Sequence, residues 1–218
     1  YPPSMKMRYW RRFGSLAGCF VGLAGSGAEP TADKATVSWA DGTDPSVAAI
    51  LAVGDRAIDH YGRSLLSEVK RTLNATTPAV AIGKVHLKEY KIPAPVPGQP
   101  VATAVRRTSL KLRSAANAPD APDLAALNLI KDKLDAGDDI PKVLLQKVEA
   151  PGRPVEWRVY RPLGLTPQCV TCHGPGKSLD ADVKAALLQL YPGDKAIDFS
   201  PGAWRGLIRA SVADATKP

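Results

Sequence analysis

The amino-acid sequence predicts an α+β fold in which a short antiparallel sheet is flanked by helices. Two patterns carry this prediction. In the first half of the chain, apolar residues recur every three or four positions, as on one face of a helix, whereas short segments of the second half alternate apolar and polar residues, as strands do. The length of 218 residues and the hydrophobic content of 44% fit one globular domain, alone or with a tail.

Residues 1–28 have the pattern of an export signal or a membrane anchor. They hold four basic residues and no acidic residue, and so supply half of the net charge of +8. An apolar stretch rich in small residues follows the basic cluster. Because the positive end stays in the cytoplasm, we expect the rest of the chain on the periplasmic side of the bacterial inner membrane. Acylation at Cys19, cleavage after Ala28 and retention as an N-terminal anchor helix all remain open.

Residues 29–43 are predicted as a polar linker and residues 44–218 as one folded domain. The first helix of this domain is expected to begin at Asp44 and Pro45, because aspartate caps free amide groups and proline is tolerated in the first turn. Its apolar stripe continues to Leu73, and the segment 74–78 ends it. A shorter helix over 78–87 and a loop rich in proline and glycine over 92–100 follow.

The second half of the chain is predicted to combine strands and helices. Strands are expected over 107–113, 142–148, 155–161 and 207–212, where apolar and polar residues alternate or β-branched residues gather. Helices are expected over 121–136 and 179–190. Together these segments predict an antiparallel sheet with its helices on one side.

The chemistry of the chain is concentrated in the motif Cys169-Val-Thr-Cys172-His173, which has the spacing of c-type haem attachment. Two thiols separated by two residues can form thioethers to the two vinyl groups of one porphyrin, and the adjacent imidazole then ligates the iron. A thioredoxin-like pair needs a βαβ context, a zinc site needs further ligands, and a disulfide across two residues is strained. We therefore favour one covalent haem c, attached through Cys169, Cys172 and His173, with His173 as the proximal iron ligand.

Four segments of the chain resemble the Tll0287-like family of c-type haem domains. In chain order they are Val105–Asp120, Cys169–Gly174, Tyr191–Asp194 and Trp204–Gly206. The resemblance covers residues 45–213 and implies a PAS-like fold that binds one c-type haem, found alone or as the sensor part of signalling proteins. It also implies a cysteine near the haem, but Val85 stands at that position here, so this ligand does not carry over.

His86 is predicted as the distal iron ligand, which would give a bis-histidine iron. Both methionines of the chain lie within the first seven residues, before the apolar stretch, so a thioether ligand is excluded. A five-coordinate iron that binds water or a diatomic gas remains open, as do His60 and Lys84 as ligands.

Arg106 and Arg107 are candidate contacts for the haem propionates, because guanidinium groups bind carboxylates through charge-assisted hydrogen bonds. Nucleic acid is not an expected partner, since half of the basic surplus belongs to the N-terminal signal and export removes such a partner.

The sequence therefore predicts an exported, membrane-tethered monohaem c-type protein that is not an enzyme. Its expected role is one-electron transfer, or service as an accessory haem subunit of a respiratory or photosynthetic membrane complex. The expected partners are haem, a membrane protein complex or redox partner, and the inner membrane itself. The alternative is a periplasmic sensor of redox state or of a diatomic gas that signals through a partner chain.

Overall fold

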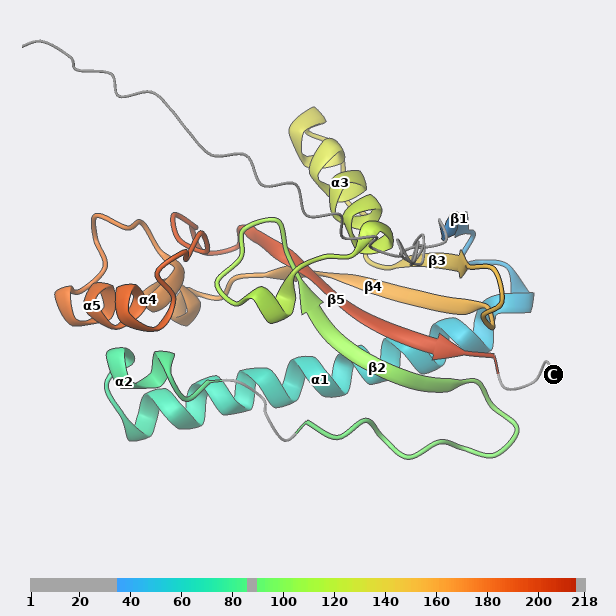
Figure 1. Ribbon diagram of the computed structural model, residues 1–218, viewed down its shortest axis with the longest axis horizontal. Helices are drawn as coiled ribbons and strands as arrows, with labels where there is room; N and C mark the ends of the chain where they lie inside the picture. Colours follow the sequence, from blue (N-terminus) through green and yellow to red (C-terminus); the bar gives the residue numbers. More distant parts are fainter. Residues whose placement is uncertain (1–34, 86–89, 215–218) are drawn as a thin grey trace, which may run out of the picture. The chain divides into compact units, whose positions relative to one another are not determined.

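The computed structural model describes residues 35–85 and 90–214, which form a five-stranded antiparallel sheet with helices (Figure 1). The strands lie in the order β1-β3-β4-β5-β2, so β1 and β2 are the two edges. Their bounds are β1 Thr36–Ala40, β2 Val101–Thr108, β3 Leu144–Glu149, β4 Glu156–Gly164 and β5 Trp204–Ala213. The structure confirms the predicted α+β class.

The long helix α1 (Ala48–Ala75) begins as the sequence predicts. Asp44 accepts a hydrogen bond from the Ser46 amide at 2.8 Å, and Pro45 opens a single 3-10 turn that leads into the helix. The buried face of α1 carries Ile50, Ala57, Ile58 and Tyr61, which pack against apolar residues of β4 and β5. This contact forms the main apolar core, on one face of the sheet.

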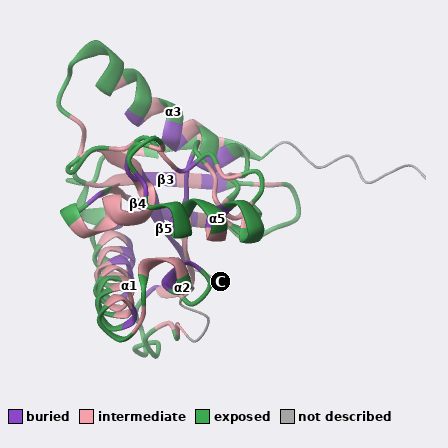
Figure 2. Ribbon diagram, turned by 90° about the vertical axis from the view of Figure 1, so that its left-hand side faces the viewer, coloured by how far each residue is buried: buried purple, intermediate pink, exposed green. Residues whose placement is uncertain are grey.

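The helix α3 (Ala121–Ala136) packs on the opposite face of the sheet, so the prediction of helices on one side is wrong. The alternation of β4 explains the difference. Val159 packs in the core under α1, whereas the next residue, Tyr160, packs against Ala126, Leu127 and Ile130 of α3. The strands β4 and β5 are therefore buried on two faces, and the purple segments of the sheet in Figure 2 mark buried residues.

A buried polar network joins α3 to the sheet. The Asp123 carboxylate, which is 0% exposed, accepts hydrogen bonds from the Tyr160 hydroxyl at 3.0 Å and from Arg209 at 3.2 Å. The Tyr160 hydroxyl also lies 3.0 Å from the Gln146 side-chain oxygen. Arg158 pairs with Asp120, the residue that caps the N-terminus of α3, at 2.7 Å. Directional bonds as well as apolar contact thus hold this helix.

Three short helices gather at one end of the domain (Figure 1): α2 Pro78–Ile82, α4 Val170–His173 and α5 Ala181–Leu190. Ile82 of α2 forms a small apolar cluster with Leu179 and with Val183 and Leu187 of α5, and Cys172 of α4 packs against this cluster. This cluster positions α4, which ends at His173, close to α2 and α5. No helix among residues 35–85 and 90–214 has the length and apolar character needed to cross a bilayer.

Three predicted segments differ from the structure. The helix expected over 78–87 ends at Ile82. The predicted linker over 29–43 contains β1, whose β-branched and aromatic residues pair with β3, for example Val37 opposite Val148. The strand expected over 107–113 instead ends at Thr108, because the Ser109 hydroxyl accepts the Lys111 amide at 3.1 Å and turns the chain out of the sheet. The predicted N-terminal signal or anchor over 1–28 lies outside the described residues.

Candidate functional site

The C-x-x-C-H motif occupies a 3-10 turn, Pro167–Cys169, followed by the one-turn helix α4. Cys169 and Cys172 are free thiols with partly exposed side chains. Burial raises the pKa of the Cys172 thiol, so this group is protonated at neutral pH. Gly174 ends the helix, and a Cβ atom there would lie 2.5 Å from the Val170 carbonyl oxygen, so the position directly after the motif requires glycine.

His173 is held in one tautomer. Its Nδ1 atom lies 2.7 Å from the Ala196 carbonyl oxygen, and a carbonyl can only accept, so Nδ1 carries the proton. Burial, and after it the positive charge of Arg113, lower the pKa of His173 to about 3. The imidazole is therefore neutral at physiological pH, and its Nε2 atom keeps a free lone pair. This is the state in which a histidine binds a metal.

A cleft lies between α4 and the helices α1 and α2, and its empty space, including the open mouth, is about 1010 Å³. Both cysteines of the motif and His173 line it. The remaining wall is mostly apolar, with side chains from α1, from α2 and the end of β4, and from the residues that follow these two elements: Leu65, Val69, Leu73, Ala81, Ile82, Val85, Leu163 and Leu165. A cleft of this size and lining suits a large, flat, apolar group with a few polar contacts.

Arginines supply the positive charge of the cleft. Arg107 and Arg205 line it, and within the described residues neither forms an ion pair with a carboxylate. The Arg107 Nε atom is buried without a hydrogen-bond partner there. Burial, together with the positive charges of Arg107 and Arg113, lowers the pKa of Arg205 to about 10. An anion bound in the cleft would relieve this repulsion.

Arg106, the other arginine predicted to contact propionates, does not line the cleft. Its guanidinium group donates to the carbonyl oxygens of Ala116 and Ala118, at 3.0 and 2.6 Å, and so fixes the loop before α3. Adjacent residues of a strand point to opposite faces, which explains why only Arg107 of this pair reaches the cleft. The sequence did not predict Arg205 as a residue of the site, although Arg205 lies in the Trp204–Gly206 segment that resembles the Tll0287-like family.

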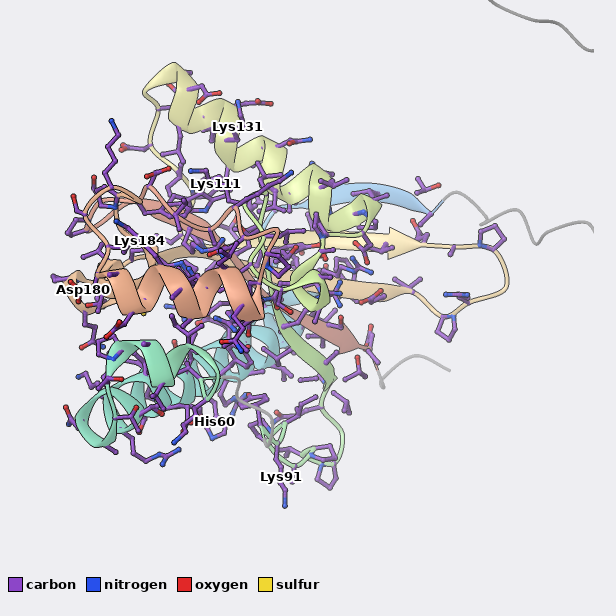
Figure 3. The ribbon with its side chains drawn as sticks, turned by 60° about the vertical axis from the view of Figure 1, so that its left-hand side comes forward. His60, Lys91, Lys111, Lys131, Asp180 and Lys184 are labelled. Carbon is purple, nitrogen blue, oxygen red and sulfur yellow. The ribbon has the colours of Figure 1, made fainter. Side chains whose placement is uncertain are left out.

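The candidate distal ligands differ in their position relative to the cleft. His60 does not line the cleft, because its Nδ1 atom lies 3.3 Å from the Tyr90 hydroxyl, and Figure 3 shows it on the same side of the molecule as Lys91. Lys84 is exposed and also lies outside the lining. His86 falls outside the described residues, whereas its neighbour Val85 lines the cleft.

Comparisons with known proteins agree with the sequence resemblance. A family model, Tll0287-like, matches residues 49–213. Among solved structures, the cyanobacterial heme-protein Tll0287 matches with 23% sequence identity and a TM-score of 0.38, over 52% of this chain and 63% of that one. This chain therefore spans less than two thirds of that protein's length. No curated protein matches the chain. On the match over residues 49–213, the chain belongs to the Tll0287-like family.

Proposed function

We propose that this protein carries one c-type haem, attached covalently through Cys169 and Cys172 and ligated on its proximal side by His173. The observation that carries the proposal is the neutral His173 imidazole, fixed by Ala196 with Nε2 free, between two free thiols and an open apolar cleft. The relative Tll0287 is a heme-protein, which supports the same cofactor class.

The residues of the cleft fit this cofactor. The thiols of Cys169 and Cys172 would each form a thioether, and the side chains of α1 and α2 would cover an apolar porphyrin face. Arg107 and Arg205 would bind the two propionates, whose charge balances the unpaired charge of these arginines. Bound there, the iron supplies a one-electron redox couple.

We further propose that the protein is not an enzyme and acts in one-electron transfer, alone or as an accessory haem subunit of a membrane complex, on the periplasmic side of the inner membrane. The protein's own part is to hold the proximal imidazole, to keep water from the apolar face and to place positive charge beside the propionates. We also propose that the fold is PAS-like.

A second candidate is a redox or gas sensor that signals through a partner chain. One observation favours it: the α1 wall of the cleft consists of Leu65, Val69 and Leu73, whose aliphatic side chains suit a small neutral gas molecule. The distal position decides between the two functions. With His86 as a ligand, the iron would have no free coordination position. Without that ligand, the iron could bind a gas molecule.

Haem retention after denaturation tests the proposed cofactor. The chain is produced in cells that attach c-type haem, separated on a denaturing gel and stained for haem. We expect the wild type and the Cys19→Ala variant to retain haem, because Cys19 lies outside the motif. The double variant Cys169→Ala, Cys172→Ala should lose it. A wild-type protein that releases haem on denaturation would refute covalent attachment.

The optical spectrum of the reduced protein, with and without carbon monoxide, separates the two functions. An unchanged spectrum indicates a closed six-coordinate iron and argues against gas sensing. We expect His86→Ala to convert a low-spin spectrum to a high-spin one, whereas His60→Ala, which changes a residue outside the cleft lining, should leave the spectrum unaltered. A low-spin spectrum in His86→Ala would exclude His86 as the ligand.

A further inference from the structure

Arg113 lies at the centre of a hydrogen-bond network next to the C-x-x-C-H motif. Its side chain is 14% exposed and forms an ion pair at 2.9 Å with Asp194, whose side chain is 7% exposed. Its Nε atom also donates to Asp194, at 3.0 Å. The Nη2 atom donates to the Cys172 carbonyl oxygen at 2.5 Å and lies 3.4 Å from the Ala196 carbonyl oxygen. One guanidinium group thus bridges the motif and a loop more than twenty residues farther along the chain.

That loop carries the acceptor of the His173 proton. The segment 191–199 contains no helix or strand, so side chains and single backbone bonds must fix its position. The Asp194 carboxylate accepts the Ala196 amide at 2.8 Å, and the Lys195 amide donates to the Leu112 carbonyl oxygen at 2.8 Å. The backbone of Ala196, which is 0% exposed, is therefore held from both sides by Asp194 and Arg113.

Only an arginine can make these contacts together. Its planar guanidinium group presents five donors in a fixed fork, which can reach a carboxylate and two carbonyl oxygens at once. A lysine at this position keeps the positive charge, but its single ammonium nitrogen cannot donate to three acceptors in these different directions. The function of Arg113 thus depends on the geometry of its donors as well as on its charge.

We propose that Arg113 is the positioning residue of His173. By tying Cys172, Asp194 and Ala196 into one unit, it keeps the Ala196 carbonyl oxygen where it accepts the Nδ1 proton, and so keeps Nε2 as the ligating atom. Donation from Nδ1 also makes Nε2 a more basic ligand, which favours the oxidised iron. The role in tuning the iron rests on the proposed function, whereas the control of the tautomer does not.

Two measurements on the full chain test this role. The first uses ¹⁵N NMR of the chain produced without haem, which reports the tautomer of His173. We expect Arg113→Lys to lower the ratio of the Nδ1–H to the Nε2–H form roughly two- to tenfold, the effect of losing one ordinary hydrogen bond. The second is a redox titration of the haem-loaded protein, in which Arg113→Lys should raise the midpoint potential, because Nε2 becomes a weaker donor to the oxidised iron.

Arg106→Lys is the matched control, because Arg106 also donates to two backbone carbonyl oxygens but lies outside the cleft lining. It should leave the tautomer ratio and the potential unchanged. If Arg113→Lys fails to fold, Asp194→Ala removes the other anchor of Ala196 and should lower the tautomer ratio in the same way. A wild-type tautomer ratio in the variant that folds overturns the inference. If the wild-type chain never attaches haem but Arg113→Lys still lowers the tautomer ratio of the haem-free chain, the proposed function alone is refuted.

Discussion

Helix α1 packs tightly on the sheet at Gly54, and substitution there gives a prediction of defined size. A Cβ atom at Gly54 would lie 2.3 Å from Cγ2 and 2.7 Å from Cβ of Val159. Rotation of the valine side chain can move Cγ2 but not Cβ, and Val159 is 0% exposed in the central strand β4. Gly54→Ala therefore forces helix and sheet apart.

The expected change in the free energy of unfolding is the difference between two opposing effects. Overpacking of a core costs about 1–3 kcal/mol, and the fixed Cβ places this site at the upper end. Alanine in place of glycine inside a helix returns about 1 kcal/mol. We expect Gly54→Ala to lower the free energy of unfolding by roughly 2 kcal/mol, which corresponds to a fall in Tm of about 4–8 °C for a domain of this size.

Gly62→Ala, on the same helix, is the matched control. A Cβ atom at Gly62 would lie 3.9 Å from the Cδ1 atom of Ile208, an ordinary van der Waals distance. Only the higher helix propensity of alanine applies here, so this variant should have a free energy of unfolding about 1 kcal/mol higher than the wild type. Thermal unfolding followed by circular dichroism measures both variants. A Gly54→Ala protein as stable as Gly62→Ala would refute the packing of α1 on β4.

Three further predictions concern polar groups of the sheet, of the N-terminus of α3 and of the cleft. Tyr160→Phe should lower the free energy of unfolding by about 1–3 kcal/mol in urea titrations, because buried Asp123 loses a donor; an unchanged midpoint would contradict the network. Asp120→Asn keeps the helix cap but loses the ion pair with Arg158. Although burial opposes it, this pairing lowers the pKa of Asp120, so the stabilisation is present above pH 4 and lost as the pH falls below about 4. The stability difference between wild type and Asp120→Asn should therefore shrink in acid, and a constant difference would exclude the pair as its cause. Arg205→Gln should raise the Tm of the haem-free chain, since it removes a half-buried charge that has no carboxylate partner within residues 35–85 and 90–214, and a lower Tm would contradict this reading of the cleft.

Local sequence signals predicted where the helices begin better than where they end. Asp44 with Pro45, and Asp120 with the first turn of α3, mark helix starts through caps that need no distant partner. The strand expected over 107–113 was misplaced, because alternation continues past Thr108 while a serine side chain turns the backbone. The position of α3 on the opposite face depends on partners from β3, β4 and β5, which periodicity along one segment cannot reveal.

The functional site, like the fold, could be predicted from the sequence only in part. The attachment motif lies within five consecutive residues, so its spacing alone indicated its chemistry. Arg205, Arg113 and the Ala196 carbonyl reach the cleft or His173 from other parts of the chain, and no local pattern connects them with the motif. His86 as the distal ligand stays a prediction.

The polar network beneath α3 has a consequence for how this sequence can change over generations. Apolar contacts such as those of α1 tolerate exchanges among aliphatic residues of similar volume. The bonds among Asp123, Tyr160 and Arg209 are directional, and losing one partner leaves a buried group unsatisfied. The aliphatic residues on the α1 face, unlike Gly54, can therefore change one at a time, whereas the polar residues beneath α3 must change together or not at all.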